Sequence, residues 1–580
     1  MQRCDRWLLP LAAGALALLV WLPLGLAGVP LDTPDGFLHL GWAAGWARQV
    51  AGGWWWPQWI DLNWAGAGSF SPAIYPPLFR LLVGLPLLSG VAPDHALAGA
   101  LLAVLLVNTS GALTLARVWL PPGPWRWWLL LGASLNPYLM VNIYVRGAWP
   151  EALAQALLWC FAAGLVGVRQ RRRWGLAMAA GALAAVLLSN WNAALLTLIL
   201  WGLAAAALAA GRAWRPLLGW GLAGLLALLG TALFWGPALA LLPQLRAPIP
   251  AGLFPGEFFL AGAAGAGSFA QLLWIQALVL ALLLAARWLG WGARADWLGW
   301  WGLGVGLLSL ALMLPISEPL YGLVTPLQRI QFPWRWLGPG WLGALLWLTS
   351  AGLAHNRANQ MALGRRSAAG LLVAGALAGW FDGLWRFRTN LVGHAPSGAE
   401  RLALRRLLAC DPLLPCPEGV KALEVGGELA KRFSPLADGR VALAGVPDYS
   451  PASVPDRSWN RRLQTFWLPA WPQQRWAQFN GDGSARLIDH GPRHRTLRVE
   501  AKGMGSLRLM QWAHPNWRLQ VRPAQSPAAA WSPPLPNGAR DADGWISVSL
   551  PQGQWEVALS YGSSRLDASR LNESRSGEFR

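Results

Sequence analysis

Two residues near the start of the chain have the types and the spacing of a proton-transfer or cation-binding pair. Asp35 and His39 are four residues apart and follow Pro34. A helix beginning near Pro34 would carry both side chains on one face. A carboxylate and an imidazole placed together can take a proton from an acceptor or bind a cation. The alternative is that Asp35 caps this helix and His39 packs in it, and spacing alone favours that alternative.

Several familiar catalytic patterns are missing from the sequence. It has no Ser-His-Asp order, no pairing of a thiol with a histidine, and no Cys/His metal cluster. It also has no glycine loop followed by a lysine that would cradle a phosphate. The chemistry of Asp35 and His39 therefore depends on the elements that position them.

The composition indicates an integral membrane protein. Of the 580 residues, 55% are hydrophobic and only 13% are charged, which excludes a disordered chain. The apolar residues form blocks long enough to cross hydrocarbon, which argues against an ordinary soluble protein. The net charge of +20 does not indicate a nucleic-acid partner, because the arginines of the apolar region lie in short breaks between blocks. Many of the 42 Trp residues lie at the ends of these blocks, as expected at a bilayer interface.

The chain divides near residue 385 into a membrane domain, 1–384, and a polar domain, 385–580. The first domain is predicted to be polytopic and α-helical with about 11 spans. The first block has a basic start like a signal peptide, but it is too long for one and is predicted to be an uncleaved span. The predicted spans are 7–29, 95–119, 125–144, 150–168, 174–188, 192–210, 216–242, 271–288, 297–314, 335–353 and 368–384.

The positions of the arginines predict how these spans are oriented. Short arginine-rich loops favour the cytoplasmic side, which places the N-terminus inside and the domain 385–580 outside. The outer side then carries a long first loop, 30–94. Its apolar segment 75–88 is too short to span and is predicted to be a helix lying on the outer membrane face. The arginines predicted to be cytoplasmic are Arg3, Arg6, Arg117, Arg126, Arg169, Arg171, Arg172, Arg173, Arg212, Arg215, Arg287, Arg294, Arg357, Arg365 and Arg366.

The domain 385–580 has the alternation that is typical of β-strands. Apolar residues recur at every second position, and Pro and Gly separate the runs, so we predict a compact β-sandwich-like domain. Cys410 and Cys416 enclose the segment Asp-Pro-Leu-Leu-Pro. Because the outer compartment would be oxidising, a disulfide between them is favoured over two free thiols. The alternating sets are Leu497 and Val499, Leu507 and Leu509, Leu519 and Val521, Ile546, Val548 and Leu550, and Val557 and Leu559.

Motifs along most of the chain resemble those of the glycosyltransferase C (GT-C) superfamily. The first loop contains PDGFLHL, RQVAGGWWWPQW and GAGSFSPAIYPPLFRLL, followed by VRGAWPEALA at 145–154, SNWNAALL at 189–196 and LQRIQFPWRWL at 327–337. The segments HPNWRLQV and GWISVSLPQGQWEVALSY resemble the β-domain of relatives. Within the superfamily, the chain is most similar to bacterial membrane proteins called "6-pyruvoyl-tetrahydropterin synthase-related", a name that implies no pterin chemistry here. Many of those relatives end with another span, whereas this sequence ends in polar residues.

The resemblance implies an enzyme that takes a sugar from a polyprenyl-phosphate donor at the outer membrane face. In that superfamily an acidic residue of the first outer loop activates the acceptor, and Asp35 matches this position. A second acidic residue commonly follows the third span, and Glu151 matches that place. The candidate catalytic residues are therefore Asp35, His39 and Glu151.

Three arginines near the predicted outer face are candidates for binding the donor phosphate. A departing phosphate carries negative charge, which a guanidinium can stabilise. The alternative is ordinary contact of these side chains with lipid headgroups. The three candidates are Arg146, Arg329 and Arg335.

The cofactor and the partners follow from the same resemblance. Some members of the superfamily need a divalent cation and others do not; Mg²⁺ or Mn²⁺ held by Asp35, His39 and Glu151 is one option that the sequence leaves open. The implied partners are the lipid bilayer, a polyprenyl-phosphate-linked sugar, and an envelope glycan, lipid or protein as the acceptor. The implied location is a bacterial inner membrane, with the C-terminal domain in the periplasm.

Two other function classes compete with the glycosyltransferase. A non-catalytic scaffold for assembly of envelope polysaccharide would keep Asp35 and Glu151 for structural reasons. A transporter would place charged residues near the middle of its spans, and the predicted spans hold almost none there. Transport is therefore ranked last.

Overall fold

The computed structural model describes most of the membrane domain and the last sheets of the chain. Among the predicted features, the span 368–384, the loop with Arg357, Arg365 and Arg366, and Cys416 lie outside the described residues. The described residues are 2–31, 33–61, 68–245, 268–291, 295–330, 332–351, 353, 398–410, 433–435, 441–443, 459–460, 465–466, 476–526, 530–535, 540–541 and 544–562.

The chain forms two compact units, which are described separately. The first unit comprises Met1–Leu40, Tyr75–Pro237 and Ile249–Gly398. The second comprises Gly41–Ile74, Ala238–Pro248 and Ala399–Arg580. The second unit thus includes part of the predicted first loop besides the C-terminal region, and the division into 1–384 and 385–580 stays a prediction.

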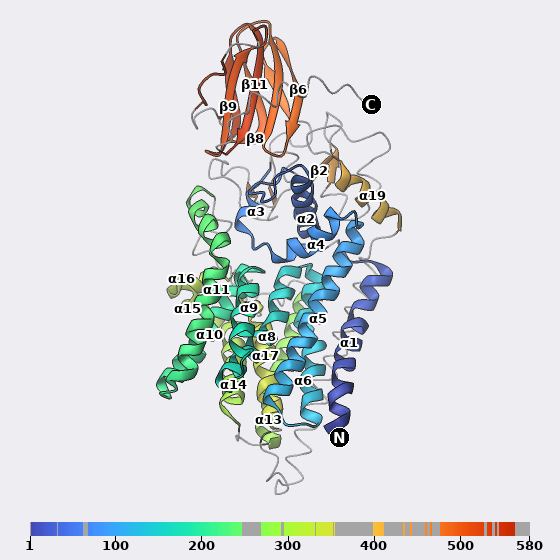
Figure 1. The fold of residues 1–580 in the computed structure, drawn as a ribbon, viewed down its shortest axis with the longest axis vertical. Helices are drawn as coiled ribbons and strands as arrows, with labels where there is room; N and C mark the ends of the chain where they lie inside the picture. The colour runs from blue at the N-terminus through green and yellow to red at the C-terminus, as the bar shows by residue number, and fades with distance from the viewer. Residues whose placement is uncertain are drawn as a thin grey trace. The chain divides into compact units, whose positions relative to one another are not determined.

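The first unit is a bundle of helices (Figure 1). The helix α8 lies in the apolar core of this unit. It is buried along almost its whole length and packs against α5 and α9. Glycines allow this close packing: a Cβ at Gly164 would clash with the backbone nitrogen of Ala179. The helices of this unit are α1 (Gln2–Ala27), α4 (Leu78–Leu88), α5 (Pro93–Trp119), α6 (Pro124–Ser134), α7 (Pro137–Met140), α8 (Trp149–Arg169), α9 (Gly175–Leu187), α10 (Trp191–Ala210), α11 (Trp214–Leu241), α13 (Ser268–Trp291), α14 (Trp297–Leu312), α15 (Glu318–Leu323), α16 (Thr325–Gln328) and α17 (Leu337–Thr349).

Six helices in the described part of the chain are long and apolar enough to cross a membrane, or seven if the bent pair α14 and Pro315–Leu323 counts as one span. The protein is thus a mostly helical membrane protein, but the predicted number of about 11 spans is not confirmed. Two predicted spans, 174–188 and 271–288, coincide with helices whose described apolar parts are short, Gly175–Leu187 and Leu273–Ala286. The predicted helix at 75–88 is present as α4, and its place on the membrane face stays a prediction.

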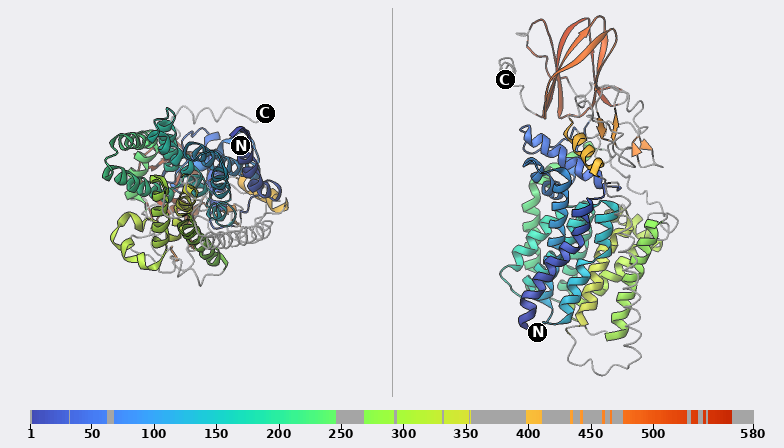
Figure 2. Two further views of the ribbon diagram at one scale, coloured as in Figure 1. Left: turned by 90° about the horizontal axis from the view of Figure 1, so that it is seen from below. Right: turned by 90° about the vertical axis from the view of Figure 1, so that its right-hand side faces the viewer.

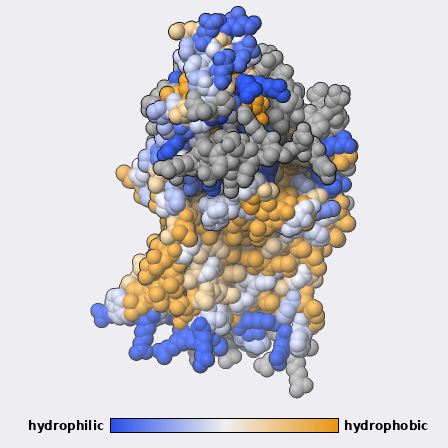
Figure 3. Space-filling model, turned by 45° about the horizontal axis from the view of Figure 1, so that its top comes forward, coloured by the Kyte–Doolittle hydropathy of each residue, from blue (hydrophilic) through white to orange (hydrophobic). Residues whose placement is uncertain are grey.

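Large apolar side chains remain exposed on the helices of the first unit, as a surface in contact with lipid requires. Leu225, Leu229 and Leu233 on α11 are examples, with Leu233 being 89% exposed. Figure 3 shows hydrophobic residues gathered over the surface of the helices, with hydrophilic residues at the lower end.

Among its described residues, the second unit contains two larger antiparallel sheets and two short strand pairs (Figures 1 and 2). One sheet has the strand order β10-β8-β5 and the other β6-β7-β11-β9. Strands lie at each of the alternating sets predicted from the sequence, and Leu497, Val499, Leu507 and Leu559 are fully buried among them. The strands are β5 (Ala477–Asn480), β6 (Gly483–Gly491), β7 (His494–Ala501), β8 (Gly505–Trp512), β9 (Trp517–Pro523), β10 (Trp545–Leu550) and β11 (Gly553–Tyr561), with short pairs β1 (Phe433–Pro435) with β2 (Val441–Leu443) and β3 (Trp459–Asn460) with β4 (Thr465–Phe466).

Aromatic side chains attach part of the first loop to these sheets within the second unit. The ring centre of Trp59 lies 5.9 Å from that of Trp517, and the ring centre of Phe70 lies 4.1 Å from that of His514. Trp59 is completely buried. This unit also holds the later part of α2 (Gly36–Ala51), α3 (Ser71–Ile74) and α19 (Gly398–Ala409). Near the end of α19, the carbonyl oxygen of Cys410 accepts a hydrogen bond from Arg48.

Candidate active site

A tight turn places Asp35 at the start of α2, in the first unit. The amide of Gly36 donates to Oγ1 of Thr33, and the carbonyl oxygen of Asp35 accepts from the amide of His39 at 3.3 Å. The amide of Asp35 in turn donates to the carbonyl oxygen of Arg146 at 2.9 Å. The turn that carries Asp35 is therefore tied to the segment that precedes α8.

Gly147 is the residue that permits this approach. Its φ is +68°, and a Cβ at this position would lie 2.5 Å from the amide nitrogen of Gly36. A side chain here would be strained by the backbone conformation and would clash with the turn. The glycine of the motif VRGAWPEALA therefore has a structural role in bringing Asp35 to Arg146.

His39 follows Asp35 on α2, and its ring is buried among aromatic side chains. Its ring centre lies 5.6 Å from that of Tyr75 and 6.2 Å from those of Phe79 and Trp149. Burial, with a smaller contribution from the positive charge of Arg146, lowers the pKa of His39 to about 3. The imidazole is neutral at physiological pH and packs as an aromatic ring, while its predicted role in proton transfer stays a prediction.

A short π-helix, η2 (Val141–Arg146), positions Arg146. It continues α7, whose first turn is capped by the side chain of Asn136. Short π-helical turns often occur at functional sites. Here Oδ1 of Asn142 accepts a hydrogen bond from Nη1 of Arg146 at 2.6 Å.

Glu151, in the first turn of α8, is the centre of a buried ionic network. Its Oε2 accepts a hydrogen bond from Nη1 of Arg146 at 3.0 Å, and its Oε1 accepts one from the hydroxyl of Tyr138 at 2.8 Å. Nε of Arg335 lies 3.5 Å from the same Oε2. The side chain of Glu151 is 3% exposed, so its charge is balanced by these partners rather than by water.

Asp35 is the accessible carboxylate of the cluster. Its Oδ2 lies 3.9 Å from Nη2 of Arg146, and its side chain is 38% exposed, against 3% for Glu151. The same arginine thus reaches a buried carboxylate and an open one. Such an arrangement can hold Asp35 in place while leaving its oxygen atoms accessible to an acceptor.

Arg335 brings donor groups that the network does not use. It lies in η6 (Pro333–Trp336) and is 7% exposed, with its guanidinium 5.1 Å from the ring centre of Phe332. Among the described residues, Nη1 of Arg335 has no hydrogen-bond partner, and the same holds for the buried Nδ2 of Asn142. Unsatisfied buried donors are costly, and they are suited to an anion or a polar ligand.

The structure brings five of the six predicted site residues into one region and leaves one apart. Asp35, Arg146, Glu151 and Arg335 form the ionic cluster, and His39 packs beside it. Arg329 is exposed at the end of α16 and makes no hydrogen bond or ion pair to the cluster within the described residues.

Two members of the cluster were missed by sequence analysis, Tyr138 and Asn142. The sequence pattern that could have revealed them is a spacing of four residues, from Tyr138 to Asn142 and from Asn142 to Arg146. This spacing places the three side chains on one face of a helix. No pattern based on catalytic residue types would have selected an Asn and a Tyr in an apolar segment.

The candidate metal ligands do not fit a cation. The carboxylate of Glu151 is already paired with two arginines, and His39 is enclosed by aromatic rings. In the described part of the chain, no group of three His, Cys, Asp or Glu side chains is placed to hold a metal ion.

Of the cysteines, Cys410 is disulfide-bonded and Cys160 is a free thiol in α8. The predicted partner of Cys410, Cys416, lies outside the described residues. The pairing of Cys410 with Cys416 stays a prediction.

Comparisons with known proteins leave the family of the chain open. No family model matches it, so the name "6-pyruvoyl-tetrahydropterin synthase-related" has no support, and no curated protein matches it either. A solved structure of the arabinofuranosyltransferase AftD from mycobacteria is similar over 96% of this chain and 60% of its own, at 12% sequence identity and a TM-score of 0.40. The chain thus spans less than two thirds of that protein. At this TM-score the likeness is no basis for assigning fold or activity.

Proposed function

We propose that the protein is a membrane glycosyltransferase. It moves a sugar from a polyprenyl-phosphate donor to an envelope acceptor, with Asp35 as the general base. The observation that carries the proposal is the pairing of an accessible carboxylate, Asp35, with a buried, positively charged network that has unused donors. The motifs in the first loop and at 327–337, which resemble the GT-C superfamily, support the same activity.

The proposed reaction is a displacement at the anomeric carbon of the donor sugar. The acceptor hydroxyl attacks this carbon while the bond between the carbon and the phosphate oxygen breaks. Asp35 takes the proton of the hydroxyl, and polyprenyl phosphate leaves with the bonding electrons. The products are the glycosylated acceptor and polyprenyl phosphate, so that atoms and charge balance.

Arg335 is the residue best suited to the leaving phosphate. Its Nη1 is buried and has no hydrogen-bond partner among the described residues, so it can bind an anion without giving up an existing bond. A guanidinium held in a site with little water stabilises developing negative charge strongly. Arg146 is also a candidate, but its Nη1 already donates to Glu151 and Asn142.

Glu151 and Arg146 act in this proposal as positioning residues. Glu151 holds Arg146 and Arg335 in fixed places by its charge, and Arg146 links this pair to Asp35. The low pKa of His39 keeps its ring neutral, so the ring adds no positive charge beside Asp35. Glu151 itself is not the base, because both of its oxygen atoms already accept hydrogen bonds.

The location proposed for this activity is a bacterial inner membrane. The arginine distribution supports an orientation with the cluster and the C-terminal sheets on the periplasmic side. The substrates are then a polyprenyl-phosphate-linked sugar and an envelope glycan, lipid or protein.

The experiment that tests the activity is a transfer assay. Membranes from a strain that lacks the protein are mixed with a panel of radiolabelled polyprenyl-phosphate sugars, with and without the purified protein. Label that enters a polymeric or protein-bound fraction only when the protein is added supports the proposal. Equal incorporation with and without it, for every donor in the panel, contradicts it.

A non-catalytic scaffold is the second candidate. It is favoured by one observation: the full pairing and burial of Glu151 are also what a purely structural network requires. A scaffold has no use for an accessible carboxylate at Asp35, so replacing that charge distinguishes the two candidates.

A further inference from the structure

The chain turns sharply at the end of α14. It bends by 91° between α14 and the segment Pro315–Leu323, which consists of the 3-10 helix η5 (Pro315–Ser317) and α15. Figure 1 shows α15 and α16 at one side of the helical bundle. A pair of helices bent to a right angle cannot cross a bilayer as one span. The segment after α14 therefore lies across the axis of that helix.

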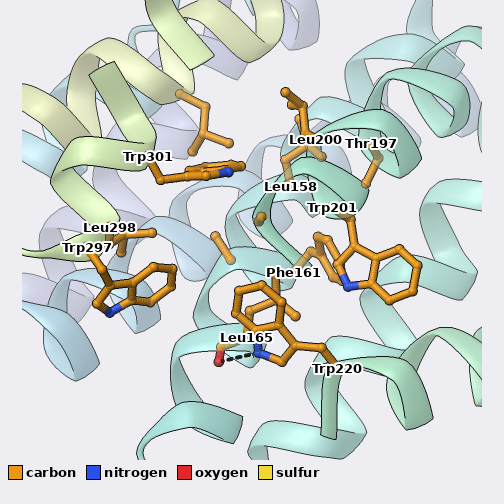
Figure 4. Close-up of a pocket in the computed structure, with 13 residues that line it drawn as sticks. Leu158, Phe161, Leu165, Thr197, Leu200, Trp201, Trp220, Trp297, Leu298 and Trp301 are labelled. Carbon is orange, nitrogen blue, oxygen red and sulfur yellow. Dashed lines mark hydrogen bonds between the residues drawn. The ribbon is translucent and has the colours of Figure 1, made fainter. Parts of the chain in front are cut away.

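The first half of α14 marks one membrane interface. Trp297 and Trp301 of α14 line a small apolar pocket with Phe161 of α8 (Figure 4). The guanidinium of Arg169, in the last turn of α8, lies 4.7 Å from the ring centre of Trp297. An arginine over an indole at the ends of two apolar helices is typical of a bilayer interface. We infer that α14 begins near the interface that carries the arginine-rich loops.

From this interface, α14 is too short to reach the other one. Its 16 residues correspond to about 24 Å at 1.5 Å per residue, whereas the hydrocarbon core of a bilayer is about 30 Å thick. Any tilt of α14 shortens its reach further. The bend and the segment after it are therefore expected to lie within the hydrocarbon of the leaflet opposite to the arginine-rich loops.

The segment exposes large apolar side chains at this depth. Ile316 is 83% exposed and Leu323 is 82% exposed. Leu314 and Leu320 are also exposed, and so is Leu307 on α14. Single apolar side chains on a protein surface are common, but a run of them that continues from a lipid-facing helix indicates contact with acyl chains.

The backbone at the bend is hydrogen-bonded within the chain. The carbonyl oxygen of Leu312 accepts hydrogen bonds from Oγ of Ser317 at 3.1 Å and from the hydroxyl of Tyr321 at 3.2 Å. The hydroxyl of Ser317 also lies 2.8 Å from the carbonyl oxygen of Leu314. A loop in water can leave such carbonyl groups to the solvent, whereas a segment in hydrocarbon has to satisfy them internally. Prolines have no amide hydrogen to satisfy, and three fall in or beside this segment: Pro315, Pro319 and Pro326.

Tyr321 fixes the segment to the bundle. Its side chain is completely buried, and its hydroxyl accepts a hydrogen bond from Nε1 of Trp336 at 3.0 Å. Trp336 lies in η6 and is completely buried as well. The segment therefore has a fixed place on the bundle, and Ile316 and Leu323 are held outward from it.

We propose that the segment 314–324 is embedded in lipid, where Ile316, Leu320 and Leu323 contact the acyl chains of the leaflet opposite to the arginine-rich loops. It forms a partly inserted turn that neither crosses the bilayer nor extends into water. Amphipathic segments of this kind bury their apolar side chains about 5–10 Å into the boundary between headgroups and acyl chains. The partner of this surface is phospholipid, and the proposal does not depend on sugar transfer.

The test places a fluorescent label at two equally exposed positions of the full-length protein. Ile316→Cys lies in the segment, and Met504→Cys, at an 84% exposed position between β7 and β8, is the control. Both changes are made in a parent with Cys4→Ser and Cys160→Ala, labelled with nitrobenzoxadiazole and reconstituted in phosphatidylcholine vesicles. The signal of the labelled parent is subtracted. We expect phosphatidylcholine with a nitroxide on its acyl chain to quench the Ile316→Cys label alone, and aqueous iodide to quench the Met504→Cys label alone.

A second measurement uses charge. Leu323→Asp places a carboxylate on the exposed surface of the segment, and Met504→Asp makes the same change at the control position. Because a charge in hydrocarbon is costly, Leu323→Asp should lower the amount of folded protein in the membrane, and Met504→Asp should not. Quenching of the Ile316→Cys label by iodide would show that the segment lies in water, and protection from both quenchers would show that protein covers it. Either result, or equal amounts of folded protein for the two aspartate variants, would contradict the proposal.

Discussion

Arg146 meets Asp35 twice, once through its backbone and once through its side chain. Its carbonyl oxygen accepts the amide of Asp35 at 2.9 Å, and its Nη2 lies 3.9 Å from Oδ2 of Asp35. The first contact fixes the turn that carries Asp35, and the second places a positive charge beside the carboxylate. Because Arg146 also donates to Glu151, the accessible acid and the buried acid are held by one side chain.

The first prediction concerns the buried acid. Glu151→Gln keeps the shape of the side chain but leaves Arg146 and Arg335 without their balancing charge. Removing one partner of a buried ionic network is expected to lower the free energy of unfolding by about 3–5 kcal/mol. The measurement is the unfolding temperature of the detergent-solubilised protein. Glu318→Gln, at an exposed glutamate of α15, is the matched control, and a similar small change in both variants would argue against a structural role for the network.

The second prediction separates two arginines that the sequence could not distinguish. Arg335→Gln should lower the rate of sugar transfer by about 10²–10³-fold, the usual effect of losing a donor to developing negative charge. Arg329→Gln should be much milder, because Arg329 is exposed and apart from the cluster. Both variants are assayed over a range of donor concentrations. If Arg329→Gln were as damaging as Arg335→Gln, the phosphate would have to bind elsewhere.

The third prediction uses the pKa of His39, which is about 3 in the folded protein against 6.5 for an ordinary histidine. As the pH falls below about 6.5, the unfolded chain takes up this proton and the folded chain does not, so folding stability is lost. From pH 7 to pH 5 this loss amounts to about 2 kcal/mol. His39→Phe keeps an aromatic ring and should abolish this pH-dependent loss of folding stability. The measurement is the unfolding free energy of both proteins at the two pH values, and an equal loss in both would show that His39 is not buried in its neutral form.

The sequence predicted the strands better than the spans. Alternating pairs such as Leu497 and Val499 mark strands because successive side chains point to opposite faces, and Arg498 between this pair is exposed. Spans are harder to count from apolar blocks, since a block such as 174–188 becomes a helix of 13 residues, α9, that packs against α8. An apolar run of this length does not reveal whether it faces lipid or other helices.

The charged residues of the candidate site were predictable from the sequence, but Tyr138, Asn142 and the environments of all these side chains were not. Arg146 was selected because it lies near the predicted outer face, Glu151 because it follows the third predicted span, and Asp35 because it lies in the first predicted outer loop. That Glu151 is buried and Asp35 is accessible depends on how the turn at Gly147 packs, which no local pattern encodes. The roles of these residues stay predictions until the variants are measured.

The most direct test of the proposed activity is Asp35→Asn in the transfer assay. Asparagine keeps the shape of the side chain and serves equally well at a helix start, so the amount of folded protein in the membrane should not change. It removes the charge that a general base requires, and transfer should fall by at least about 100-fold. Asp32→Asn, three residues earlier, is the control and should be much milder. Equal transfer by Asp35→Asn and wild type, normalised to folded protein, would contradict the catalytic role of Asp35 and favour the scaffold.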